Sequence, residues 1–183
     1  MFVDALVQRV SASETFDLRR RVLRPHQTIE EMTLQGEEAP DTAFFAARDA
    51  TSGIVLATAS VQYEAPPWEP QALRDRDHVG PQNRLEVPGD VRSVTGVEGA
   101  NAWRLRAMAT ADGFRGQGLG RRVREAVIDH VSTRGGGLLW CAARIRAVPF
   151  YARAGFSPLG DFYEEPVIGT HVLMWRVVAA STT

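Results

Sequence analysis

The chain has 183 residues, of which 44% are hydrophobic, and this is enough for the core of one domain. A formal net charge of −1 leaves no broad basic surface, so nucleic acid is not expected as a partner. All 21 basic residues are arginines, and the absence of lysine excludes Schiff-base chemistry and a P-loop with its phosphate-binding lysine.

Cysteine usage and the start of the chain indicate a cellular compartment. The single cysteine, Cys141, cannot form an internal disulfide, and the first residues lack the basic start and apolar stretch of a secretion signal. No apolar run approaches the roughly 20 residues that span a bilayer. We expect a cytoplasmic protein without a membrane partner.

The N-terminal part predicts a strand followed by a helix. Residues 2–10 are short and apolar-rich, and they precede a Ser-x-x-Glu pattern formed by Ser11 and Glu14. In such a pattern each side chain can satisfy the free backbone N–H of the other residue at a helix start. The helix should end near Leu23, because Pro25 disfavours helical geometry at the residue before it.

The next segments predict a short helix, a hairpin and a long loop. Residues 28–34 carry two glutamates and precede a glycine, which favours a short helix. Residues 42–48 and 54–63 are enriched in strand formers and flank a turn, so they should pair. Residues 64–99 contain five prolines and predict an irregular surface loop.

The remaining chain alternates strands and helices. Residues 103–110 predict a strand, and apolar residues recur at helical spacing from Leu119 to Val131 before the stop at residues 135–137. The later expected elements are a strand at 138–142, a helix at 147–154, and strands at 156–159 and 171–178. This order predicts a mixed α/β fold over residues 1–183, without internal repeats.

A glycine-rich loop, Arg115-Gly-Gln-Gly-Leu-Gly120, joins the strand at 103–110 to the following helix. Glycines at a helix start let backbone N–H groups approach an anion, which favours a phosphate ligand. The arginines that add positive charge here are Arg115, Arg121, Arg122 and Arg124. A tight turn without a ligand is the alternative. A dinucleotide-binding fold is disfavoured because no acidic residue follows near position 140.

Two motifs resemble the GCN5-related N-acetyltransferase (GNAT) superfamily. Arg115, Gly118 and Gly120 match its Arg-x-x-Gly-x-Gly acetyl-CoA motif. About 30 residues later, the segment 147–156 with Tyr151 is similar to the second signature of the family. Segments 18–25 and 168–174 are similar to a bacterial, ElaA-type branch.

The resemblance implies a fold, a cosubstrate and a set of binding residues. The fold is a twisted, mostly antiparallel sheet flanked by helices, with a V-shaped splay between the fourth and fifth strands. The cosubstrate is acetyl-CoA, and no metal is implied. The residues implied in cofactor binding are Met108, Ala109, Thr110, Arg115, Gly116, Gln117, Gly118, Leu119, Gly120, Arg121 and Tyr151. One departure is Arg144, where the family often has asparagine.

Acyl transfer to an amine requires removal of a proton from the amine and delivery of a proton to the thiolate. By resemblance, Tyr151 is the acid, and the backbone N–H of Met108 stabilises the oxyanion on the thioester carbonyl. The base stays open between His171, Glu30, Glu31, Glu64 and water. His171 is included among the catalytic residues, because histidine changes charge near physiological pH.

The predicted activity is direct transfer of acetyl from acetyl-CoA to a primary amine of a small molecule or peptide. One alternative is a non-catalytic sensor of acyl-CoA. Another is an acetyltransferase that acts on hydroxyl groups or on peptide N-termini. The sequence leaves the acceptor, the acyl-chain length and the oligomeric state open, a homodimer included.

Overall fold

The computed structural model describes residues 3–67 and 101–181. The strands are β1 Ala5–Val10, β2 Ala43–Asp49, β3 Val55–Tyr63, β4 Ala102–Thr110, β5 Gly137–Arg144, β6 Ser157–Glu165 and β7 Gly169–Val178. They form a seven-stranded sheet in the order β1-β2-β3-β4-β5-β7-β6, with β4 and β5 parallel. The α-helices are α1 Phe16–Leu23, α4 Leu119–Thr133 and α5 Val148–Ala152. The mixed α/β fold predicted from the sequence is confirmed.

Four expected elements differ in extent or type from the structure. The helix expected at 28–34 is reduced to a single 3-10 turn, η2 Glu30–Met32, and the helix expected at 147–154 is the shorter α5. The last two strands are longer than expected, because β6 and β7 pair with each other over most of their length. The loop expected at 64–99 lies outside the described residues from position 68 onward.

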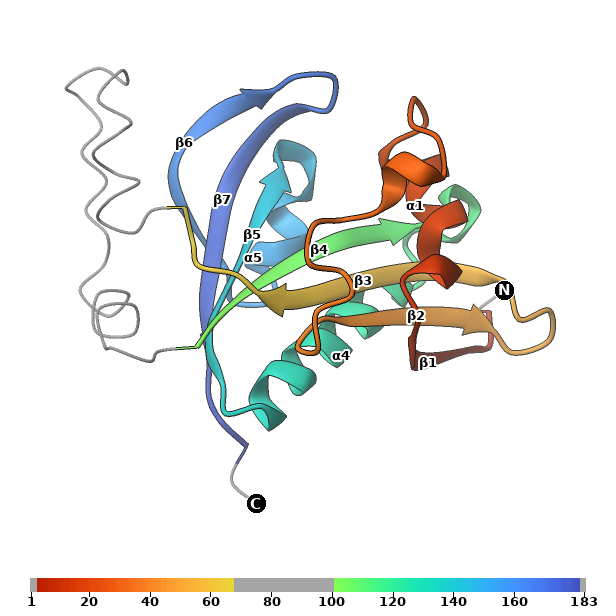
Figure 1. Cartoon of the computed structure of the whole chain (residues 1–183), viewed down its shortest axis with the longest axis horizontal. Coiled ribbons are helices and arrows are strands. Elements are labelled where there is room, and N and C mark those ends of the chain that lie inside the picture. Colours follow the sequence, from red (N-terminus) through yellow and green to blue (C-terminus); the bar gives the residue numbers. More distant parts are fainter. Residues whose placement is uncertain (1–2, 68–100, 182–183) are drawn as a thin grey trace. The chain divides into compact units, whose positions relative to one another are not determined.

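The first of two compact units comprises Met1–Gln62 and Leu105–His130. Here β1, β2 and β3 pair antiparallel, so neighbouring residues of β2 face opposite sides of the sheet. Phe44 faces α1, where the Arg19 guanidinium lies 5.4 Å from its ring centroid. Phe45 faces α4, where its ring meets His130 edge-on at 5.7 Å. The two helices therefore cover opposite faces of these strands (Figure 1).

The second unit comprises Tyr63–Arg104 and Val131–Thr183. Its strands β5, β6 and β7 form the antiparallel ladders β5–β7 and β6–β7 (Figure 1). Its apolar cluster consists of Leu138, Trp140, Leu159, Leu173 and Trp175. Gly136 and Gly137 allow close backbone packing, because a Cβ atom at Gly137 would lie 2.2 Å from the Asn101 carbonyl oxygen. These glycines therefore permit close backbone packing in addition to ending α4.

The Ser11–Glu14 pattern forms only half of the expected reciprocal cap. The Glu14 carboxylate accepts the Ser11 N–H at 2.7 Å, but the Ser11 hydroxyl also donates to this carboxylate, at 2.8 Å, instead of capping the Glu14 N–H. The hydrogen bond from the Ser11 N–H is the main reason that the pKa of Glu14 lies below its usual value. A lowered carboxyl pKa stabilises the fold at neutral pH, and this contribution is lost as the pH falls through the lowered value.

We therefore expect Glu14→Gln to reduce the free energy of unfolding at pH 7 by about 0.5 kcal/mol, since the site is largely exposed. At pH 3 the variant and the unmodified protein should differ less, because the contribution of the Glu14 carboxylate is lost as the pH falls through its lowered pKa. Urea denaturation at the two pH values measures this difference. An equal loss at both values would show that the charge of Glu14 is irrelevant.

Candidate functional site

The glycine loop connects β4 to α4 in the first unit. After Thr110, the Ala111 N–H donates to the Leu56 carbonyl oxygen at 2.8 Å, and one 3-10 turn, Asp112–Phe114, follows. Gly116 and Gly118 have φ values of 79° and 82°, in the left-handed region that favours glycine. The loop therefore requires glycine at both positions to reach the start of α4.

Open space adjoins both of these glycines. A Cβ atom built on Gly116 or Gly118 would meet no heavy atom within 4 Å among the described residues. The first turn of α4 contains no acidic residue, and the N–H groups of a first helical turn point out of the helix end. The positive end of the helix dipole lies at the same place. These features fit an anionic group such as a pyrophosphate.

The arginines around the loop differ in their exposure and in their ion pairs. Arg115 pairs with Asp112 at 2.6 Å and Arg121 pairs with Glu125 at 3.7 Å, and both pairs are exposed. Exposed pairs contribute little stability, so these two guanidinium groups can exchange their partners for a phosphate. Arg124, by contrast, is 5% exposed. The sequence had grouped all of these arginines together.

The Gln117 side chain makes hydrogen bonds within the first unit. Its Oε1 atom accepts the Val3 N–H at 3.3 Å, and its Nε2 atom lies 3.5 Å from the Gly113 carbonyl oxygen. The amide thus joins the beginning of the chain to the loop. Spacing along the sequence gave no signal for this contact.

The predicted oxyanion donor follows an unusual backbone position. Ala107 in β4 has a φ value of 53°, in the left-handed region that a residue with a Cβ rarely adopts. Such positions cost roughly 1–3 kcal/mol and tend to occur at functional sites. Met108 and Thr110 are half-buried, and Ala109 is buried. Because the residue is alanine, no glycine or asparagine marked the position in the sequence.

Tyr151 lies on α5 in the second unit and is 6% exposed. Its ring packs edge-on against those of Phe150 and Phe156, with centroid distances of 5.2 and 5.5 Å. The Arg176 guanidinium donates to the Ala154 carbonyl oxygen at 2.5 Å and lies over the Phe156 ring. Hence α5 and Tyr151 lie on the face of β7 that carries Arg176.

His171 lies on the opposite face of β7, because it is five positions from Arg176 and successive residues of a strand face opposite sides. It is 4% exposed, and its Nδ1 atom lies 2.6 Å from the Gly169 carbonyl oxygen. A carbonyl oxygen can only accept, so Nδ1 carries a proton, and in the neutral imidazole the lone pair is then on Nε2. His171 pairs in register with Arg144 on β5 and with Tyr163 on β6.

Glu64 is held at three points. Its N–H donates to the Ala102 carbonyl oxygen at 3.1 Å, its carbonyl oxygen accepts from Trp140 Nε1 at 2.9 Å, and its carboxylate pairs with Arg104 at 2.5 Å. The Arg104 guanidinium also lies 4.7 Å from the Trp140 ring centroid. The carboxylate therefore already has a cationic partner, which makes it a weaker candidate for the base than His171.

The other candidate groups are less suited to proton transfer. Glu30 and Glu31 are exposed on η2, and the Glu31 carboxylate accepts the Thr28 N–H at 2.7 Å. Cys141 is buried, and burial raises the pKa of its thiol well above the usual value. A buried, protonated thiol is not a nucleophile. In residues 3–67 and 101–181, no cluster of three or more potential metal ligands occurs.

Comparison with known proteins supports the resemblance found in the sequence. Residues 86–174 match the family model described as an acetyltransferase (GNAT) domain. The uncharacterized N-acetyltransferase YitI of Bacillus subtilis (strain 168) is 26% identical over 175 residues, which cover 96% of this chain and 97% of YitI. These matches confirm the resemblance to the GNAT superfamily and support an N-acetyltransferase.

Solved structures agree with this class at the level of the fold. The ribosomal-protein-S18-alanine N-acetyltransferase of Escherichia coli has a TM-score of 0.63 at 15% identity, covering 98% of this chain and 97% of that one. Escherichia coli ElaA has a TM-score of 0.58 at 16% identity, covering 94% and 99%. An aminoglycoside 6′-N-acetyltransferase in complex with coenzyme A has a TM-score of 0.63 at 12% identity, covering 97% and 99%. No helix in the described part of the chain has the length and apolar composition needed to cross a membrane.

Proposed function

We propose that this protein transfers an acetyl group from acetyl-CoA to a primary amine of a small molecule or peptide, directly within a ternary complex. The observation that carries the proposal is the open, left-handed turn at Gly116 and Gly118, placed at the start of the 15-residue helix α4. The coenzyme A complex of the aminoglycoside 6′-N-acetyltransferase supports the choice of cosubstrate.

In this proposal, residues 115–121 hold the pyrophosphate, and the backbone of Met108, Ala109 and Thr110 holds the pantetheine arm. Tyr151 completes the cofactor-binding set. Acetyl-CoA supplies an activated thioester. The Met108 N–H stabilises negative charge on the thioester oxygen, and the bend at Ala107 sets the direction of the following peptide group.

Two proton transfers are assigned to two residues. His171 Nε2 takes a proton from the acceptor ammonium, so that the amine nitrogen can bond to the acetyl carbon. As the carbon–sulfur bond breaks, the Tyr151 hydroxyl gives its proton to the thiolate. The two side chains lie on opposite faces of the strands of the second unit. This separation suits a reaction in which the nucleophile and the leaving group need different proton partners.

A thiol-release assay with acetyl-CoA and a panel of amines tests the activity. The panel includes polyamines, amino sugars, amino acids and peptides, and mass spectrometry identifies the product. Release of CoA that depends on an amine supports the proposal. Binding of acetyl-CoA without release for any acceptor would indicate a sensor, and acetylated hydroxyl groups or peptide N-termini would identify another acceptor class.

His171→Asn tests the assignment of the base. Asparagine keeps an N–H donor for the Gly169 carbonyl oxygen but removes the Nε2 lone pair, so we expect kcat to fall by about 100-fold. The affinity for acetyl-CoA, measured by calorimetry, should not change. His130→Asn replaces a histidine that packs against Phe45 and serves as the control. If both variants keep full kcat, the base is another group.

We also propose that residues 1–183 act as one acyltransferase domain. Both β4 and α4 contain residues of the two units, so neither unit has a complete set of elements by itself. A single cooperative unfolding transition, monitored by two probes, is the expected behaviour. Two separate transitions would contradict it.

A further inference from the structure

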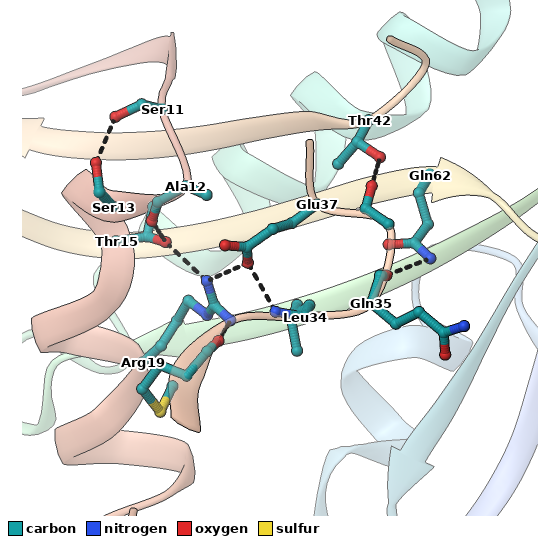
Figure 2. Close-up of polar contacts among 12 residues, drawn as sticks. Ser11, Ala12, Ser13, Thr15, Arg19, Leu34, Gln35, Glu37, Thr42 and Gln62 are labelled. Atoms are coloured by element: carbon teal, nitrogen blue, oxygen red, sulfur yellow. Dashed lines mark hydrogen bonds and ion pairs between the residues drawn. The ribbon is translucent and has the colours of Figure 1, made fainter. Parts of the chain in front are cut away.

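A buried ion pair occupies the side of the first unit that α1 covers. Arg19 on α1 is 1% exposed, and its Nη1 atom lies 3.7 Å from the Glu37 carboxylate, which is itself 6% exposed (Figure 2). The guanidinium lies over the rings of Phe16 and Phe44, at 5.2 and 5.4 Å from their centroids. Burying two charges is costly, so a pair kept here needs a reason beyond stability.

The pair fixes the backbone of the segment between η2 and β2. Arg19 Nη2 donates to the Met32 carbonyl oxygen at 2.5 Å, and Nη1 contacts the Thr15 hydroxyl at 3.4 Å. The Glu37 carboxylate accepts the Leu34 N–H at 2.8 Å (Figure 2). Residues 32–37 are therefore held to α1 through side chains from both ends of the pair.

Two further side chains hold the same segment to the strands. The Thr42 hydroxyl donates to the Gly36 carbonyl oxygen at 2.6 Å, and Gln62 Nε2 donates to the Gln35 carbonyl oxygen at 3.3 Å (Figure 2). Gly36 has a φ value of 79°, and a Cβ atom there would lie 3.4 Å from the Gln62 amide. The segment thus has one fixed path, set by contacts from α1, β2 and β3.

This segment covers a sheet face that is polar along β3. Thr58, Ser60 and Gln62 alternate on one face and are all buried. Register pairing puts Ser60 beside Phe44, on the side of Arg19. Within the described residues the Thr58 hydroxyl has no hydrogen-bond partner. Buried polar groups normally have partners, so this face is not an ordinary apolar core.

In the first unit, α4 and residues 32–37 lie on opposite faces of the sheet. The glycine loop leads into α4, which packs on the Phe45 face, whereas residues 32–37 lie on the Phe44 face. An acceptor amine must reach the thioester carbon from a direction that the cofactor does not occupy. If the loop holds the cofactor, as in the proposed function, the acceptor approaches from the Phe44 side.

We propose that Arg19, together with Glu37, is a positioning residue for the acceptor: the pair holds residues 32–37 in the path that shapes acceptor binding, without touching the cofactor. This inference rests on the proposed function. We call the Arg19–Glu37 pair the clamp. Its loss should weaken acceptor binding and leave acetyl-CoA binding unchanged, because misplacing a positioning group by about 1 Å can cost up to roughly 100-fold in rate.

The experiment compares Arg19→Met with Arg21→Met in the full chain. Arg21 lies on the same helix, but its ion pair with Asp17 is exposed, so its replacement is the matched control. For Arg19→Met we expect the KM of the best amine from the panel to rise about tenfold and the KM of acetyl-CoA to stay within about twofold. The control should leave both values unchanged.

A second variant separates positioning from stability. Arg19→Met with Glu37→Gln removes both buried charges, while glutamine can still accept the Leu34 N–H, so the double variant should unfold at a higher temperature than Arg19→Met alone. The acceptor KM should nevertheless stay raised, because the Met32 carbonyl oxygen has lost its donor. Recovery of the acceptor KM along with stability would overturn the proposal, as would a parallel rise of both KM values.

Hydrogen–deuterium exchange gives a readout that does not need turnover. Amides of residues 32–37 should exchange faster in Arg19→Met than in Arg21→Met, with exchange elsewhere in the first unit unchanged. Unchanged exchange at 32–37 would show that the pair does not hold the segment. If the unmodified protein acetylates no amine, the proposed function and the acceptor role both fail, whereas the exchange result still reports on the clamp itself.

Discussion

Gly118→Ala should abolish most of the affinity for CoA while leaving the protein folded. Gly118 has a φ value of 82°, so a side chain there costs roughly 1–2 kcal/mol of backbone strain. The new methyl group would occupy the open space that we assign to the pyrophosphate. We expect the Kd of CoA, measured by calorimetry, to rise about 100-fold, which is about 2.7 kcal/mol.

Gly53→Ala is a closely matched control for this experiment. Gly53 has a φ value of 72°, and its Cβ position is also open, but it lies in the turn between β2 and β3. Both variants therefore carry similar strain, and only one of them changes the loop. Equal CoA affinity in the two variants would contradict the assignment of the glycine loop as the pyrophosphate site. Loss of affinity in Gly53→Ala would show that strain, and not the local obstruction, weakens binding.

Tyr151→Phe should reduce kcat by about 100- to 1,000-fold, the range expected when a general acid is lost. Phenylalanine keeps the edge-on packing against Phe150 and Phe156, so the fold and the affinity for acetyl-CoA should change little. The measurement is steady-state CoA release with the best amine, combined with calorimetric binding of CoA. A fall in affinity equal to the fall in kcat/KM would mean that the hydroxyl binds the cofactor instead of donating a proton.

Tyr163→Phe serves as the control for Tyr151→Phe. Tyr163 lies on β6, pairs in register with His171, and its ring centroid is 6.0 Å from that of the imidazole. Removing its hydroxyl should change kcat by no more than about threefold, because it has no proton to transfer in the proposed reaction. If this variant lost as much activity as Tyr151→Phe, the acid would have to be assigned again.

Local signals in the sequence were enough to predict the resemblance to the GNAT superfamily. The glycine loop and the segment 147–156 are contiguous, and glycine at Gly116 and Gly118 is required by the backbone itself. The periodicity of residues 119–131 predicted α4, and Pro25 correctly predicted the end of α1 near Leu23. Each of these signals depends on neighbours within a few residues, so no tertiary information was needed.

The extent of the weaker elements depended on partners far along the chain. Residues 28–34 had the composition of a helix, but only η2 forms there. The segment that follows is held by side chains from other elements, because Arg19 and Gln62 donate to the Met32 and Gln35 carbonyl oxygens. The strand expected at 156–159 extends to Glu165, because β7 offers a continuing ladder. Local propensity does not include such contacts between distant parts of the chain.

The tertiary structure alone decided how the candidate catalytic groups are arranged. The sequence left the base open between His171, Glu30, Glu31, Glu64 and water. Glu64 meets Arg104 and Trp140, which are 40 and 76 residues away, and the His171 imidazole is oriented by the Gly169 carbonyl oxygen. The left-handed residue at Ala107 and the buried pair of Arg19 and Glu37 had no sequence signal either. The sequence thus indicated which side chains are available for the proposed chemistry, whereas burial, strand register and long-range contacts decided how these side chains are arranged.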